Sequence, residues 1–199
     1  MKKLLIATSN PWKIQMFREL LKWVPLDLIF LSDLDEKIPS PIEDWETIED
    51  NALLKARYYC EKTWFDALAD DAWFEIEELG GKPGIMARRW AWELPDETTD
   101  EDWLTFYHDK TKHLNWEKLN ASFPFARCLY LTDWRHFFQK DKIPFYLSRT
   151  PRRPYKNWWP TSALRIFEDW RHEMDVAGDD EIWHEQAKKP WLLKLLENL

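Results

Sequence analysis

The chain has 199 residues, with 28 Lys and Arg against 36 Asp and Glu, which gives a formal net charge of -8 at pH 7. This acidic balance argues against broad, charge-driven binding to nucleic acid, and no nucleic-acid or membrane partner is expected. Hydrophobic residues make up 45% of the sequence, which excludes an intrinsically disordered chain. Two cysteines are too few for a disulfide framework, and the apolar run 4–7 is too short for a signal peptide, so we expect a cytoplasmic protein.

The N-terminal part alternates between short apolar runs and amphipathic stretches. Residues 2–7 are predicted to form a buried strand, 12–23 a helix and 26–31 a second strand, in a β-α-β crossover. Thr47 and Asp50 resemble a helix-capping box, which predicts a helix through about residue 63. These elements indicate an α/β fold.

The following segments extend this pattern with more strands. A short strand over 67–69 is expected to end at Asp70 and Asp71, followed by a glycine-rich loop and an exposed helix. Together, these strands and helices predict a mixed central sheet flanked by helices. The remaining predicted elements are a strand at 74–77, the loop at 80–84, the exposed helix at 100–113, strands at 126–131, 143–147 and 163–167, and a leucine-rich helix toward the C-terminus after residue 181.

A first candidate site follows the first predicted strand. Thr8, Ser9 and Asn10 precede a helix start, where free backbone N–H groups and the helix dipole favour phosphate. Lys13 adds a positive charge on the first turn. The glycine spacing of a Walker loop is missing, so an ordinary polar helix cap is the alternative interpretation.

A second candidate site is acidic. Asp70 and Asp71 are adjacent, and such a pair is stabilised by a cation such as Mg²⁺ between it and a polyanion. Glu43 lies in another acidic stretch, and Lys55 lies on the predicted helix after it. Taken singly, each of these groups is better explained as part of a solvated, charged surface.

Taken in order, the motifs resemble those of the inosine triphosphate pyrophosphatase family, over about residues 1–100. The resemblance implies an elongated mixed sheet in two lobes with an active-site cleft between them. It implies one domain over 1–199, with a phosphate and metal lobe at about 1–100 plus the C-terminal helix, and a second lobe at about 120–180. The motifs are Ser-Asn-Pro-x-Lys at 9–13, the acidic and helical stretch 43–57, Ala-Leu-Ala-Asp-Asp-Ala-Trp at 67–73, Gly-Gly-Lys-Pro-Gly-Ile at 80–85 with Arg89 and Trp90, and the later strand 125–128.

The resemblance also implies an activity and a set of residue roles. The expected reaction is Mg²⁺-dependent hydrolysis of ITP, dITP or XTP to the monophosphate and pyrophosphate, by a homodimer that cleanses the nucleotide pool. The implied roles are Asp71 and Asp70 as catalytic acids, Asp71 and Glu43 as metal ligands, Thr8, Ser9, Asn10, Lys13 and Lys55 as phosphate-binding residues, and Trp159 and His184 as base-binding residues.

The sequence also departs from the family pattern. Ala72 stands where the family has a serine after the acid pair, and Ser162 stands where it has an aspartate in the base-binding loop. A related Maf-like pyrophosphatase with another base preference, and a catalytically weak nucleotide-binding protein, are therefore alternatives. A single-strand nucleic-acid platform is disfavoured by the net charge.

Tryptophan usage is anomalous: there are 15 tryptophans and only 4 glycines, where average usage predicts about 14 glycines. Many of the tryptophans follow aspartate, asparagine or proline, where turn chemistry favours glycine. One hypothesis is that UGA codons read as glycine in the source organism are represented here as tryptophan; the alternative is a chain that packs these rings harmlessly. Tryptophan coincides with glycines of the resembled family at positions 12, 45, 64, 73, 92 and 158.

Overall fold

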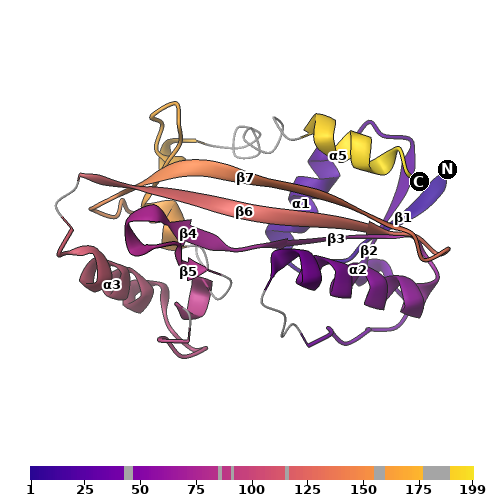
Figure 1. The fold of residues 1–199 in the computed structure, drawn as a ribbon, viewed down its shortest axis with the longest axis horizontal. Coiled ribbons are helices and arrows are strands. Elements are labelled where there is room, and N and C mark those ends of the chain that lie inside the picture. The colour runs from indigo at the N-terminus through magenta and orange to yellow at the C-terminus, as the bar shows by residue number, and fades with distance from the viewer. Residues whose placement is uncertain (43–46, 85–86, 91, 115–116, 155–159, 177–188) are drawn as a thin grey trace. The chain divides into compact units, whose positions relative to one another are not determined.

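A computed structural model describes residues 1–42, 47–84, 87–90, 92–114, 117–154, 160–176 and 189–199. The chain divides into two compact units (Figure 1). Unit 1 comprises Met1–Ala72, Phe125–Asp141 and Ile182–Leu199, and unit 2 comprises Trp73–Pro124 and Lys142–Glu181. The expected lobes, one at about 1–100 plus the C-terminal helix and one at about 120–180, stay a prediction.

The first three elements of unit 1 form the predicted crossover. Strand β1 (Lys2–Ile6) and strand β2 (Leu26–Phe30) are parallel, with Leu4 opposite Leu28. Helix α1 (Pro11–Leu20) joins them and buries Met16, Phe17 and Leu20. Proline suits the first turn of this helix because the backbone N–H that it lacks has no partner within the helix there.

Helix α2 (Ile48–Thr63) leads into strand β3 (Ala67–Ala72). The side chain of Thr47 accepts a hydrogen bond from the backbone N–H of Asp50, and its hydroxyl donates to the Asp50 carboxylate at 2.6 Å. This arrangement confirms the predicted helix start. Strand β3 lies parallel to β1 and antiparallel to β6 (Lys118–Tyr130).

The core of unit 1 contains residues from β1, β3, α1 and the C-terminal helix α5 (Lys189–Leu196). Figure 1 shows α5 on one side of the strands and α2 on the other. Alternation along β1 explains this sandwich, because neighbouring strand residues point to opposite faces of the sheet. The core cluster that α1 and α5 share includes Leu4, Ile6, Leu68, Leu129 and Leu192.

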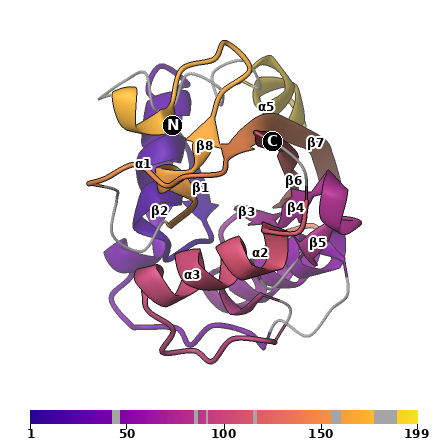
Figure 2. The same ribbon diagram turned by 90° about the vertical axis from the view of Figure 1, so that its left-hand side faces the viewer.

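Unit 2 has its own aromatic core beside helix α3 (Asp100–Thr111), which faces the viewer in Figure 2. Strand β4 (Phe74–Ile76) pairs antiparallel with β5 (Lys82–Gly84) and with β6. Strand β7 (His136–Ser148) pairs with β6, and the short β8 (Arg165–Ile166) pairs with β7. Buried core residues include Phe74, Trp90, Trp103, Tyr107 and Phe145.

The described strands form a single sheet of order β2-β1-β3-β6-β4-β5, with β7 and β8 added beside β6. The sheet contains parallel and antiparallel pairs, so the predicted α/β fold with a mixed sheet is confirmed. The elongated shape and the cleft between lobes stay predictions. None of the described helices is long and apolar enough to cross a membrane.

Some local predictions were wrong. The strand expected over 67–69 continues through both aspartates to Ala72, because β6 supplies hydrogen-bonding partners along its whole length. The helix expected to be exposed, α3, buries Trp103, Leu104 and Tyr107. The glycine-rich loop also contains the short strand β5.

Candidate active site

The candidate phosphate loop lies between β1 and α1. Asn10 caps the helix: its side-chain oxygen accepts hydrogen bonds from the backbone N–H groups of Trp12 at 2.9 Å and Lys13 at 3.4 Å. The hydroxyl oxygen of Thr8 accepts from the Asn10 N–H at 3.2 Å. Two amides of the helix start are therefore already bonded, and an anion would find the hydroxyls of Thr8 and Ser9 and the Lys13 amine.

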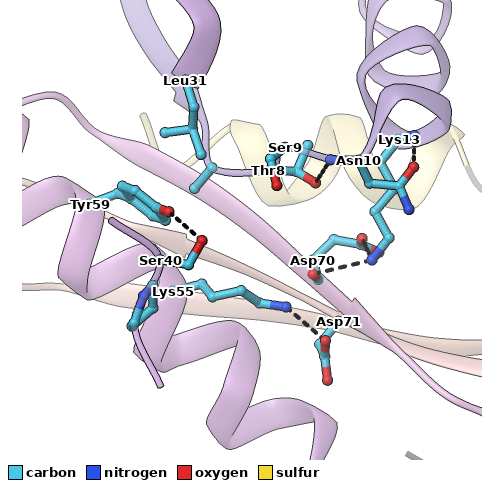
Figure 3. Close-up of a pocket in the computed structure, with 12 residues that line it drawn as sticks. Thr8, Ser9, Asn10, Lys13, Leu31, Ser40, Lys55, Tyr59, Asp70 and Asp71 are labelled. Carbon is cyan, nitrogen blue, oxygen red and sulfur yellow. Dashed lines mark hydrogen bonds and ion pairs between the residues drawn. The ribbon is translucent and has the colours of Figure 1, made fainter. Parts of the chain in front are cut away.

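The two candidate acids lie next to each other on β3, and their side chains leave the strand in different directions. Because neighbouring residues of a strand point to opposite faces, Asp70 and Asp71 approach the pocket differently. The Lys13 amine forms an ion pair with the Asp70 carboxylate and lies 3.4 Å from its backbone carbonyl. The Lys55 amine donates to Asp71 Oδ1 at 2.7 Å. Figure 3 shows the two lysines reaching these acids from separate helices.

These residues line one cavity of about 240 Å³, contained wholly in unit 1. The sequence predicted this convergence from three separate segments, and the structure brings all seven described candidates together. The cavity is lined by Ala7, Thr8, Ser9, Asn10, Lys13, Leu31, Ser40, Pro41, Lys55, Tyr59, Asp70 and Asp71.

Asp70 lies at the most strongly charged point of the site. Burial would raise the pKa of its carboxyl, but the positive charges of Lys13, Arg127 and Lys55 outweigh burial and lower the pKa below its ordinary value. Arg127 is directly opposite Asp70 in the register of β3 and β6. Asp70 is therefore an ionised carboxylate at neutral pH.

Arg127 was not predicted as part of the site. It is 1% exposed, with one guanidinium nitrogen 3.3 Å from Gln139 Oε1 and another 3.8 Å from Met16 Sδ. The guanidinium also lies over the ring of Phe125, 4.6 Å from its centroid. Arg127 lies within the motif at 125–128, but only the pairing of β3 with β6 reveals that it is opposite Asp70.

Ser40 and Tyr59 were also missed. Tyr59 lies four residues after Lys55 on α2 and therefore on the same helix face, a spacing that the sequence did contain. Its hydroxyl donates to Ser40 Oγ at 3.5 Å. Together they form the wall of the cavity beside Lys55 (Figure 3).

Three predicted residues fall outside the described part of the chain. Glu43, the second expected metal ligand, and Trp159 and His184, the expected base-binding residues, lie in segments 43–46, 155–159 and 177–188. Ser162, at the position of the family aspartate, is fully buried.

The carboxylates of the cavity suit Mg²⁺ as ligands, but the described residues supply only part of a coordination shell. Mg²⁺ prefers oxygen ligands and is usually bound by one or two carboxylates together with substrate phosphates. Asp70 and Asp71 supply two carboxylates, and among the described residues no group of three or more His, Cys, Asp or Glu side chains forms a self-sufficient metal cage. The described site therefore fits a metal that arrives with a polyphosphate.

The fold and this cavity define an α/β protein whose paired carboxylates and amines face one pocket at the start of a helix. The sequence profile of the Ham1 family matches residues 4–141. The dITP/XTP pyrophosphatase of Corynebacterium glutamicum is 33% identical over 153 residues, which are 75% of this chain and 72% of that protein. The chain belongs to the Ham1 family, and the predicted family relationship is confirmed.

Further relatives agree with this assignment. The dITP/XTP pyrophosphatase of Flavobacterium psychrophilum is 35% identical over 139 residues, 68% of each chain. The structure of a HAM1 protein from Coxiella burnetii superposes with a TM-score of 0.82 over 100% of both chains, at 22% identity. The latter comparison establishes the fold alone.

Proposed function

We propose that this protein hydrolyses non-canonical purine nucleoside triphosphates, such as ITP, dITP and XTP, to the monophosphate and pyrophosphate. Such a reaction removes deaminated purines from the nucleotide pool. The observation that carries the proposal is the convergence of Lys13, Lys55, Asp70 and Asp71 on one cavity. The names of the relatives, dITP/XTP pyrophosphatase, support the substrate class.

The amines and hydroxyls supply the triphosphate-binding function. Lys13 on α1 and Lys55 on α2 line the cavity and would contact the triphosphate from two sides, while Thr8 and Ser9 offer hydroxyl donors. Each lysine is paired with an aspartate, so binding of a polyphosphate requires these amines to exchange or share partners. Positive charge fixed beside the reacting phosphate stabilises the charge that develops there.

Asp71 is the proposed catalytic carboxylate, acting as a general base. Its side chain is 12% exposed and opens into the cavity, where an ionised carboxylate can orient a water molecule and accept its proton. Asp70 is proposed to assist by holding Lys13, and Arg127 acts as a positioning residue that keeps Asp70 ionised.

We propose Mg²⁺ as the cofactor, held by Asp71 with Glu43 and by the substrate phosphates. When bound, a divalent ion supplies charge neutralisation and polarisation at the phosphate oxygens. Asp70 and Asp71 are the described residues whose chemistry suits it. A homodimer in the cytoplasm, with Trp159 and His184 contacting the base, completes the proposal as the family resemblance implies it.

The test is release of pyrophosphate from ITP, dITP, XTP, dTTP and ATP in the presence of Mg²⁺. Preference for the inosine and xanthosine nucleotides is expected. A preference for dTTP would favour the Maf-like alternative, and binding without turnover would favour a nucleotide-binding protein. Lys55→Met should abolish the reaction. Lys22→Met, at an exposed lysine just after the end of α1, is the matched control.

A further inference from the structure

Apart from glycine, left-handed backbone in the described part of the chain occurs at tryptophan. Among the described residues other than glycine, every one with a positive φ is a tryptophan. L-residues with bulky side chains rarely adopt this conformation, because Cβ approaches the neighbouring carbonyl, whereas glycine adopts it freely. The φ values are 56° at Trp64, 45° at Trp90, 72° at Trp92, 70° at Trp134 and 70° at Trp170.

Trp64 occupies the position where helices favour glycine. It follows the last residue of α2 in the left-handed conformation, and its N–H donates to the Cys60 carbonyl at 2.8 Å. Gly80 holds the equivalent place after the short 3-10 turn Glu77–Leu79, with φ 64° and its N–H bonded to Glu77. The chain therefore uses glycine in one such cap and tryptophan in the other.

Trp134 and Trp170 occupy two turns of the same construction. In the first, the Trp134 N–H donates to the Leu131 carbonyl at 2.9 Å, and the Asp133 side chain accepts from the Arg135 N–H at 3.2 Å. This is the aspartate-then-glycine pattern of a tight turn closing two strands.

The second turn repeats these contacts. The Trp170 N–H donates to the Phe167 carbonyl at 2.9 Å, and Asp169 accepts from the Arg171 N–H at 3.1 Å. The two turns share the sequence Asp-Trp-Arg-His, at 133–136 and 169–172, and in both the left-handed residue is the tryptophan.

Four of the five left-handed tryptophans are mostly exposed, as are Trp23 and Trp191, whose φ is not positive. Trp64, Trp92, Trp134 and Trp170 are 72%, 69%, 68% and 64% exposed, although large aromatic rings are normally well buried. The Trp170 ring does stack on Tyr146, with 5.4 Å between ring centroids, but it stays mostly in solvent.

Trp90 is different, because it is 1% exposed and packs edge-on against Trp103 at 5.2 Å between centroids. Its ring is also in edge contact with Phe106 and Tyr107. Trp103 is equally buried and donates its indole N–H to the Ala87 carbonyl at 3.1 Å. Both rings fill the core of unit 2, so their loss would leave a cavity.

We infer that positions 64, 92, 134 and 170 are glycine in the protein as its own cells make it, because UGA codons are read there as glycine, whereas Trp90 and Trp103 are genuine tryptophans. The family resemblance suggested positions 64 and 92. The backbone adds 134 and 170 independently, without reference to any relative. Tryptophan also fits position 73 poorly, because the buried indole N–H of Trp73 has no hydrogen-bond partner among the described atoms.

The gene and the native protein test this inference directly. We expect UGA at codons 64, 92, 134 and 170, and UGG at codons 90 and 103. Peptide masses from the native source should show glycine at the first four positions and tryptophan at the other two. UGG at any of the four, or a tryptophan mass there, overturns the inference.

A stability comparison separates backbone conformation from mere loss of the rings. A variant with glycine at all four positions should melt above the given sequence, and a matched variant with alanine at the same positions should fall at least about 8 °C below the glycine variant. Equal melting temperatures for the glycine and alanine variants would refute the backbone argument. Trp90→Gly should lower the melting temperature, and a rise would contradict its assignment. None of these readouts depends on catalysis.

Discussion

Replacing the two neighbouring aspartates one at a time should separate stability from turnover. Asp70→Asn removes the buried carboxylate that pairs with the Lys13 amine and lies opposite Arg127, a residue that is 1% exposed. Asp71→Asn removes the carboxylate that pairs with the Lys55 amine, which lines the cavity and can be solvated there. The two substitutions are chemically identical, so each serves as the control for the other.

The expected magnitudes follow from burial. Breaking a buried ion pair by removing one partner costs about 3–5 kcal/mol. A charge-assisted hydrogen bond contributes about 1.5–3 kcal/mol to stability. After Asp71→Asn, the side-chain oxygen at position 71 can still accept a hydrogen bond from Lys55, so the expected loss of stability is at the lower end of this range. For a chain of this length, 1 kcal/mol shifts the melting temperature by about 2–4 °C. We therefore expect Asp70→Asn to lower the melting temperature by about 6–20 °C and Asp71→Asn to lower it by about 3–6 °C.

Turnover should be reduced more by Asp71→Asn than by Asp70→Asn, the opposite of the order expected for stability. Asp71→Asn removes the proposed proton acceptor and metal ligand, and loss of such a group typically lowers kcat by about 10²–10⁴-fold. Thermal denaturation by circular dichroism and pyrophosphate release from ITP at 20 °C measure the two effects, with Asp27→Asn on the exposed edge of β2 as a surface control. If Asp71→Asn proves the less stable variant, or keeps full activity, the assignment of roles is wrong.

The other predictions concern charge and cysteine chemistry. Because the pKa of Asp70 is lowered in the folded state, its ionised form stabilises the fold above the ordinary pKa of 3.8, and this stabilisation is lost as pH falls through the lower folded value. Arg127→Met should therefore move the acid-unfolding midpoint to higher pH, and an unchanged midpoint in far-UV circular dichroism would contradict the charge coupling. Burial raises the pKa of Cys60 to about 11 and of Cys128 to about 12, so native protein at pH 8 should react with iodoacetamide far more slowly than unfolded protein; equal rates would show that the thiols are not shielded.

The sequence predicted structural features correctly where the signal came from neighbouring residues. The starts of α1 and α2 were predicted well because capping and helix spacing operate within four residues. Thr47 caps α2 as expected, and Asn10 caps α1, which was the alternative interpretation of the candidate phosphate loop. The extension of β3 through Asp70 and Asp71 was not predicted, since two adjacent acids disfavour a strand by composition. Only the partner strand β6, more than 50 residues later, supplies the hydrogen bonds that override this preference.

The same non-local pairing determines what the acids can do. Had β3 ended before Asp70, as the composition suggested, both carboxylates would lie in a solvated turn, free to rotate and to pair with any cation. In the strand, their directions are fixed by the pleat, and each lies against one lysine from a different helix. A polyphosphate entering this cavity therefore meets a preset alternation of negative and positive groups, and the energy of its binding depends on replacing two existing ion pairs. This exchange explains why a divalent ion suits the site: a cation on the carboxylates compensates for the lysines that turn toward phosphate.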